Sequence, residues 1–200
     1  MKKEEPQNFE EKIASILGNN QMPEEKITQL KQAGFIHSES DNNDINILNC
    51  CGYVLGFQNS KEYKIFHREV GEYFRFRPLS RHLRDSLCPN PNFIDWLVMN
   101  NLMPKAKDLK LPIKYIILYV DQNHKTKHAA ISHPTKKNWA YSKLGDLKGI
   151  FEHPTLAITQ AYGTANYFES ISLPEVEESF FNLYKKTLPL QVQVVWENIL

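Results

Sequence analysis

The chain has 200 residues, of which 42% are hydrophobic and 12% are aromatic, and its formal net charge at pH 7 is +1. This length and composition suit one domain with a packed core, or a domain with a small attachment, and they exclude a compositionally disordered chain. A charge so close to zero provides no global field for nucleic acid or for an anionic membrane, so neither is an expected partner.

The apolar segments and the cysteines indicate the cellular compartment of the protein. The longest apolar runs, such as 115–120, are too short to span a bilayer, and the charged N-terminus lacks the apolar core of a signal peptide. Three cysteines without a framework spacing favour a reducing compartment over a disulfide scaffold. We therefore expect a cytoplasmic protein by default, with export by a system that needs no signal peptide as the alternative. The sequence does not specify an oligomeric state.

Two short amphipathic helices are expected within residues 8–34. The apolar residues of the first helix recur at the spacing of one helical face: Phe9, Ile13, Ile16 and Leu17. The second helix has Pro23 at its start and Gly34 as its stop signal. A polar run over 37–44 follows, and we therefore assign residues 1–40 to an N-terminal helical attachment.

The main domain, expected over residues 41–172, begins with a cysteine that follows a capping residue. The Asn49 side chain can cap a helix that starts at Cys50. Residues 61–87 mix acidic with basic side chains, and 93–103 are typical of a buried helix. The basic residues of this mixed segment are Lys61, Lys64, Arg68, Arg75, Arg77, Arg81 and Arg84.

Four strands are expected in the second half of the chain. β-Branched and aromatic residues dominate 114–121, and shorter segments at 127–133 and 139–144 follow across turns. Three strands joined by tight turns form an antiparallel meander, to which 162–171 adds one more strand. Helices followed by antiparallel strands predict the α+β fold class.

Residues 173–200 are expected to pack on this domain as a C-terminal helix and tail. Pro174 lies in the first turn of the helix. Four apolar residues share one face of it: Val176, Phe180, Leu183 and Tyr184. The tail over 190–196 alternates like a strand, and a helix fits it equally well.

The adjacent residues Cys50 and Cys51 raise the question of chemistry. A thiolate is the reactive form of cysteine, and the unpaired N–H groups at a helix start lower the thiol pKa and can hold an oxyanion. Cys50, directly after Asn49, fits that position. The competing interpretation is a structural residue, because free cysteine is among the most buried residue types. A disulfide between the two neighbours would be strained.

A cysteine nucleophile needs a base nearby, usually a histidine held by a third polar group. Seven histidines are present, and His128 stands out because small residues follow it on its expected strand. Strand alternation places His128 on the face opposite Ala129. Three residues are candidates for the third group: Ser142, His153 and Asn138.

These segments resemble a known family. The sequence NCCGYV at 49–54 is similar to the nucleophile motif of the NlpC-type branch of papain-like cysteine peptidases, with Cys51 in the place usually held by serine. Over roughly residues 45–168, the order of the blocks is similar to a bacterial domain of unknown function in that superfamily. The later blocks match Trp139, Ser142, Lys143, Leu144, Gly145, Ile150, His153, Tyr162 and Gly163. Two residues, where the family often has one, separate Trp139 from Ser142, which leaves room for a one-residue bulge or shift there.

The resemblance implies a papain-like fold whose antiparallel sheet packs against the helix that starts at Cys50. It also implies a cysteine peptidase, amidase, deamidase or acyltransferase, in which Cys50 attacks an amide or ester carbonyl and His128 acts as the base. Ser142 or His153 would hold the imidazole. No cofactor or metal is implied, and the substrate would be a peptide or another amide or ester, including one within a protein.

The resemblance also suggests roles around this pair. Asn49 and Cys51 would cap the helix or contribute to an oxyanion site. Four residues are candidates for lining a groove for an acidic substrate or partner: Arg75, Arg77, Arg81 and Trp139.

Four other interpretations compete with the enzyme. A zinc site would use His124, His128 and His133 with a cysteine, but no CxxC or HExxH spacing supports it. Nucleic-acid binding would use the arginines and aromatics of 67–84, where nearby acids and the near-zero net charge argue against it. A catalytically inactive interaction module on the same fold is the main alternative, because a fold does not prove activity. A secreted bacterial effector is a further alternative, by analogy of composition alone.

Overall fold

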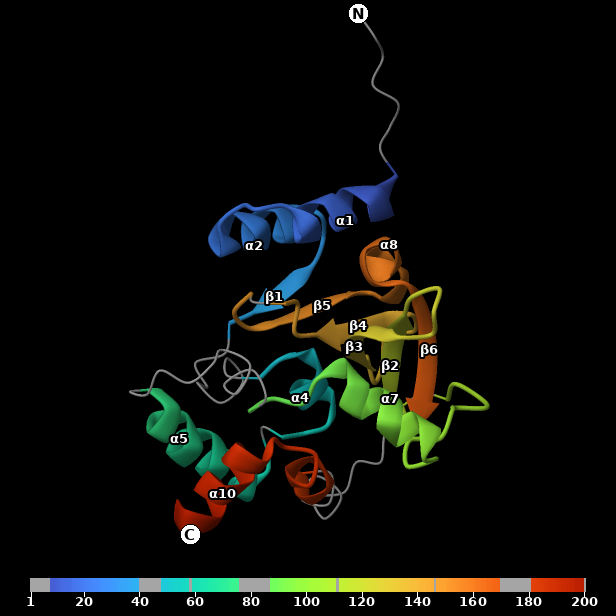
Figure 1. The fold of residues 1–200 in the computed structure, drawn as a ribbon. Coiled ribbons are helices and arrows are strands. Elements are labelled where there is room, and N and C mark those ends of the chain that lie inside the picture. Colours follow the sequence, from blue (N-terminus) through green and yellow to red (C-terminus); the bar gives the residue numbers. More distant parts are fainter. Residues whose placement is uncertain are drawn as a thin grey trace, which may run out of the picture.

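A six-stranded antiparallel sheet forms the centre of the computed structural model in Figure 1, which describes residues 8–39, 48–57, 59–75, 87–110, 112–145, 147–169 and 181–199. The strand order is β1-β5-β4-β3-β2-β6. The strands are β1 (Ile36–Ser38), β2 (Tyr115–Val120), β3 (Thr126–Ser132), β4 (Trp139–Ser142), β5 (Ile150–Pro154) and β6 (Thr164–Glu169). Helices and an antiparallel sheet together confirm the α+β class.

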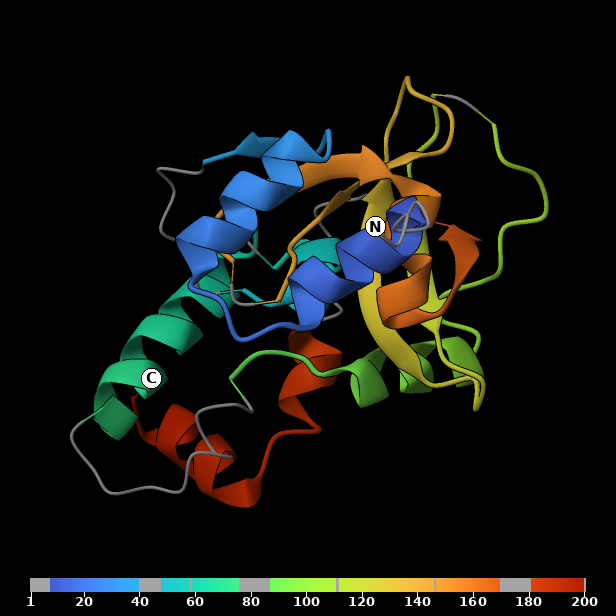
Figure 2. The ribbon, with the colours of Figure 1, turned by 90° about the horizontal axis from the view of Figure 1, so that it is seen from above.

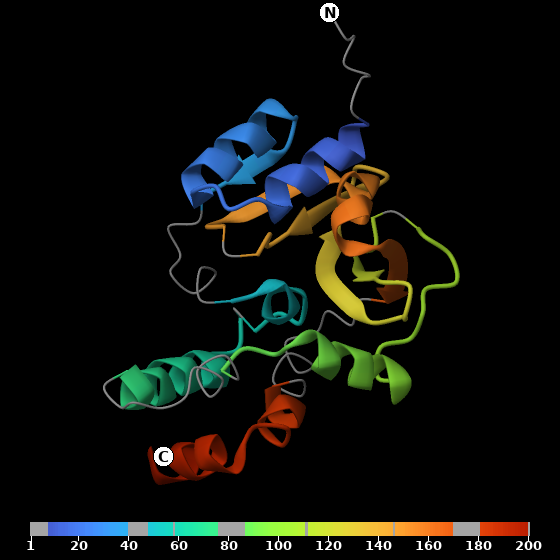
Figure 3. The same cartoon turned by 45° about the horizontal axis from the view of Figure 1, so that its top comes forward.

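Helices cover both faces of this sheet. They are α1 (Phe9–Gly18), α2 (Pro23–Gln32), α4 (Cys50–Val54), α5 (Lys61–Arg75), α7 (Pro91–Met99), the 3-10 helix η1 (Thr155–Ile158), α8 (Thr159–Tyr162) and α10 (Leu190–Ile199). Figure 2 shows α1 and α2 lying across one face. Figure 3 shows α4 and α7 next to the other face, with α5 and α10 farther out. Two hydrophobic clusters result, one on each side of the sheet.

The central meander agrees with its prediction from sequence. The strands β2, β3 and β4 pair antiparallel in chain order. The turn between β2 and β3 is stabilised by Asp121, whose Oδ1 accepts from the backbone N–H groups of Asn123 at 2.8 Å and Lys125 at 3.0 Å. The register of β4 against β3 runs through consecutive pairs, so the bulge that the spacing allows between Trp139 and Ser142 is not present. The register shift lies instead beside Tyr119 in the β2–β3 pair.

The edge strand β1 and its partner β5 were not predicted. The three residues of β1 are too few to show alternation, and β5 contains a charged residue and ends in Pro154. Gly149, at φ +79°, permits the contact between them, because a Cβ there would lie 2.4 Å from the carbonyl oxygen of Ser38. The N-terminal helical attachment therefore contributes a strand to the sheet of the main domain.

The structure corrects the bounds of one predicted helix, and it decides between helix and strand for the tail over 190–196. The helix expected over 93–103 is α7, which starts earlier, where Asn90 caps it, and ends at Met99. It stops there because Asn101 has a φ of 56° and the chain turns back to Leu97. The ambiguous tail is helical, since its buried residues Val192 and Trp196 are four apart.

The predicted C-terminal helix is only partly described. Its residues 173–180, including Pro174, Val176 and Phe180, lie outside the described residues. Residues 181–185 are helical, with Tyr184 buried and Leu183 packed against the same cluster. Within the described part of the chain, no helix combines the length and the apolar character needed to cross a bilayer.

Candidate active site

Cys50 is the first residue of α4, and Asn49 caps that helix as expected. The Asn49 Oδ1 accepts from the backbone N–H of Gly52 at 2.9 Å, and its Nδ2 donates to the Pro89 carbonyl at 2.7 Å. Both ends of the amide are therefore engaged in fixing the start of the helix. Of the two roles expected for Asn49, the structure shows the cap.

The two neighbouring cysteines lie in different environments. Cys50 is half-buried, whereas Cys51 is fully buried in the cluster beneath α4. Their sulfur atoms are 3.9 Å apart and both are free thiols. The pKa of Cys51 is raised well above its ordinary value, first by its hydrogen bond with Cys50 and then by burial. Cys51 therefore keeps its proton and donates it toward the sulfur of Cys50.

His128 lies on β3, buried between aromatic rings. Its ring stacks on Tyr162 of α8, with centroids 4.5 Å apart and planes at 18°. Tyr119 of β2 stands opposite it in the sheet register, with centroids 5.7 Å apart. Only 2% of His128 is exposed. The ring is thus held by packing on two tyrosines.

The side chains of Cys50 and His128 meet where α4 packs against β3. The pKa of the Cys50 thiol is held well below its ordinary value, and the largest cause is the hydrogen bond from Cys51. A hydrogen bond and charge interaction with His128, and the backbone N–H of Ala129, act in the same direction. Burial of the sulfur opposes them and is outweighed. This arrangement favours a thiolate at Cys50.

The candidates for a third group form a separate pair. The Ser142 hydroxyl and His153 Nε2 are 2.7 Å apart, and His153 Nδ1 lies 2.9 Å from the Pro154 carbonyl. A carbonyl can only accept, so Nδ1 carries the proton and Nε2 accepts from Ser142. Neither residue accepts a hydrogen bond from His128, because the buried Nε2 of His128 has no partner among the described residues. The expectation that Ser142 or His153 holds the imidazole of His128 is therefore not met, and the two residues bond each other instead.

Burial also sets the charge of this second pair. His153 is completely buried and stacks on Phe35, with centroids 5.1 Å apart. Desolvation lowers the pKa of His153 to about 4, and the charge of nearby His128 acts in the same direction. His153 is therefore a neutral structural residue at physiological pH.

No polar partner orients the far side of the His128 ring. Its Nε2 is buried and has no hydrogen-bond partner among the described residues. Asn138, the remaining candidate, sits in the β3–β4 turn with φ 60°, at the opposite end of β3. Its backbone carbonyl accepts from Thr155 at 2.8 Å. The structure thus brings Cys50 and His128 together, and no third polar group on His128 is found in the part of the chain that the structure describes.

The other predicted residues lie away from this pair. Trp139 begins β4 and lines a pocket at the far end of the sheet. Arg75 ends α5, and its side chain lies outside the described part of the structure, as do Arg77 and Arg81 entirely. Where the structure is described, no three His, Cys, Asp or Glu side chains gather as a metal site would require.

Residues near the pair that sequence reasoning missed include Tyr162 and Asp95. Tyr162 matches a block of the resemblance, but nothing in the sequence assigns it a contact. Asp95 is the single charged residue of α7, where apolar residues surround it on both sides, and this was an available signal. Its Oδ1 accepts from the Thr126 hydroxyl at 2.6 Å, and its charge helps to raise the pKa of Cys51.

Comparison of the chain with protein-family models, with curated proteins and with solved structures finds no match.

Proposed function

We propose that this chain is a cysteine-dependent hydrolase or acyltransferase that acts on amide or ester bonds through Cys50 and His128, on a papain-like α+β fold. The observation that carries the proposal is the contact between these two side chains together with the lowered pKa of Cys50. A buried thiol without partners has its pKa raised, so a lowered value indicates a site built to hold a thiolate. Perturbed groups of this kind concentrate at functional sites.

The chemistry follows from the paired groups. The Cys50 sulfur attacks the carbonyl carbon, its proton passes to His128, and the carbonyl becomes a tetrahedral oxyanion. His128 then gives the proton to the leaving amine or alcohol as the carbonyl–heteroatom bond breaks, which leaves a thioester on Cys50. Water or another acceptor, deprotonated by His128, attacks the thioester and releases the acyl group and the thiolate. The acceptor decides between hydrolase and transferase.

Two further groups fit this sequence of steps. The N–H groups of Cys50 and Cys51 belong to the first turn of α4, where a helix offers no internal acceptor, so they suit the developing oxyanion. The Cys51 thiol, which hydrogen-bonds Cys50, stabilises the thiolate before attack. Because the helix is only five residues long, these local donors matter more than a helix dipole.

Trapping the acyl-enzyme tests the proposal directly. With 4-nitrophenyl acetate, we expect a burst of one 4-nitrophenolate per protein, and intact-mass and peptide mapping should place one acetyl group on Cys50. The Cys50→Ala variant should show neither, and Cys88→Ala is the matched control because Cys88 is also a half-buried cysteine outside any disulfide, and it is not among the groups that lower the pKa of Cys50. Acetylation spread over Cys51 or Cys88, or equal in Cys50→Ala, would refute the proposal.

The second candidate function is a catalytically inactive interaction module. One observation favours it: among the residues that the structure describes, His128 Nε2 has no polar partner of the kind that orients a catalytic imidazole. Alkylation by iodoacetamide across pH separates the two candidates. The enzyme requires fast labelling of Cys50 well below the free-thiol pKa of about 8.5, whereas the inactive module predicts slow labelling that follows an ordinary thiol.

A further inference from the structure

A pocket of about 280 Å³ lies at the end of the sheet that the proposed chemistry does not use. It is built where β2 and β4 begin and where β3 ends. The residues that line it are Leu109, Lys110, Tyr115, Ser132, His133, Lys136, Lys137, Asn138, Trp139, Thr155 and Tyr167. Neither Cys50 nor His128 is among them. His128 and Ser132 are four residues apart on β3, which corresponds to roughly 13 Å along a strand.

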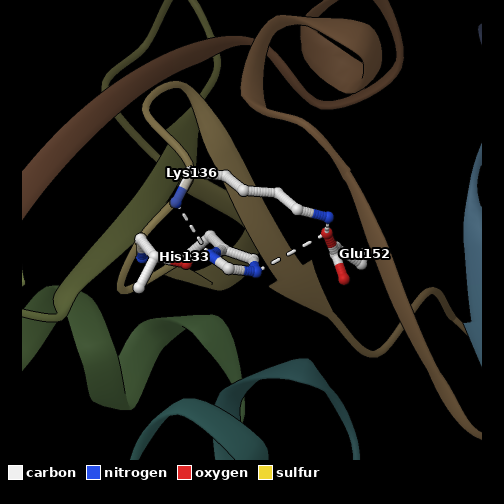
Figure 4. Close-up of polar contacts among 4 residues, drawn as sticks. His133, Lys136 and Glu152 are labelled. Carbon is white, nitrogen blue, oxygen red and sulfur yellow. Dashed lines mark hydrogen bonds and ion pairs between the residues drawn. The ribbon is translucent and has the colours of Figure 1, made fainter.

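The charged side chains of this pocket are all basic. Lys110, Lys136 and Lys137 line it, and the lining contributed by the described segments contains no Asp or Glu. Within the described residues, Lys110 and Lys137 have no acidic partner. Lys136 is held by the Glu152 carboxylate, at which the His133 ring also points, with Nε2 3.6 Å from Oε1 (Figure 4). Two of the three ammonium groups are therefore available to an anion.

The same pocket has aromatic walls in fixed positions. Tyr115 hydrogen-bonds the loop that carries Leu109 and Lys110: its oxygen accepts from the Lys110 N–H at 2.8 Å and its hydroxyl donates to the Asp108 carbonyl at 3.0 Å. The Lys136 ammonium lies 5.0 Å from the centre of the Trp139 ring. These contacts give the pocket its shape without a ligand.

One hydroxyl in the lining can donate a hydrogen bond to a ligand. The Ser132 oxygen accepts from the Tyr115 N–H at 2.8 Å, so its own hydrogen is available as a donor.

We propose that this pocket binds a small organic anion, a flat apolar body that carries one carboxylate or phosphate group. The anionic group would lie between Lys110 and Lys137, and the flat body would lie against Trp139 and the tyrosines. The volume is at the small end of the range of about 300–1,000 Å³ for ligand sites, so one or two fused rings fit and a dinucleotide does not. This site is independent of the proposed acyl chemistry.

Binding can be followed at Trp139 itself. The chain has three tryptophans, so protein labelled with 5-fluorotryptophan should give three ¹⁹F resonances, which single Trp→Phe variants assign. We expect 2-naphthoate or 2-naphthyl phosphate to shift the Trp139 resonance saturably, while Trp96 and Trp196 stay in place. The stronger of the two ligands identifies the anionic group. Neutral 2-naphthalenemethanol and inorganic phosphate should each bind at least about tenfold more weakly, because each lacks one half of the recognition.

Matched variants separate charge from fold. Lys110→Gln with Lys137→Gln should weaken binding of the anion at least about tenfold, whereas Lys107→Gln with Lys125→Gln, which removes the same charge elsewhere, should not. Binding should persist in Cys50→Ala. Any of three results would overturn the proposal. These are the lack of a saturable shift of the Trp139 resonance at millimolar ligand, equally strong binding of the neutral compound, and loss of binding in Cys50→Ala.

Discussion

Two buried histidines lie in the same sheet, and they differ in what surrounds their nitrogen atoms. His153 uses both nitrogens on neutral partners, Ser142 and the Pro154 carbonyl, and desolvation lowers its pKa to about 4. His128 meets a thiol whose pKa is lowered, and its Nε2 has no hydrogen-bond partner among the described residues. Burial alone therefore does not make a histidine structural. His153, bonded only to neutral partners, stays neutral, whereas His128 lies beside an ionisable sulfur with which it can exchange a proton.

Replacing each histidine in turn tests whether only His128 contributes to the reaction of Cys50, and it should give the largest effect. His128→Ala should reduce acylation of Cys50 by 4-nitrophenyl acetate by about 10²–10⁴-fold, the usual contribution of a general base. His153→Gln should change the same burst rate by less than about tenfold, because it removes no group that touches Cys50. Stopped-flow release of 4-nitrophenolate measures both rates. Equal losses in the two variants would show that His128 acts only through the fold.

The acid stability of the fold should report on His153. The unfolded chain binds a proton near pH 6.5, whereas folded His153 binds it only near pH 4. As the pH falls from 6.5 toward 4, the unfolded state therefore takes up the proton first, and the free energy of unfolding falls by about 3 kcal/mol. Urea unfolding at a series of pH values measures this loss. His153→Gln should flatten the curve in that window, and an unchanged curve would contradict the neutral assignment.

The ring of Tyr162, the last residue of α8, stacks on the His128 ring and helps to fix its orientation. Tyr162→Ala should slow acylation of Cys50 by about tenfold, because a misdirected imidazole costs about 1.4 kcal/mol of barrier. Tyr162→Phe keeps the ring and should retain most of the rate. If both variants lose the same activity, the Tyr162 hydroxyl and not the stacking would be responsible.

A change at Cys51 tests what lowers the pKa of the thiol beside His128. Cys51→Ala removes the largest cause of the lowered Cys50 pKa, so the midpoint of iodoacetamide labelling should move to higher pH. At pH 7 the labelling rate of Cys50 should fall by about tenfold, which corresponds to one hydrogen bond to a charged group. Mass spectrometry of the labelled peptide measures it. A midpoint that does not move would assign the lowered pKa to His128 and Ala129 alone.

Much of the fold could be predicted from local sequence, and the reasons are visible in particular segments. The strands β2, β3 and β4 were found because β-branched, aromatic or small side chains dominate them and their turns are polar. The helices α1 and α2 were found from apolar spacing, Pro23 and Gly34. The strand β1 was missed because three residues carry no periodicity, and pairing with β5 is a contact between distant parts of the chain.

The sequence by itself determined that Cys50 follows a helix-capping residue and that His128 begins a run of small residues on a strand, because both signals are local. Only the tertiary structure decided that these two side chains meet, and that Ser142 and His153 form a closed pair. It also placed Trp139 in a separate basic pocket. Hydrogen bonds between strands far apart in sequence depend on register and sheet order, which no single segment encodes.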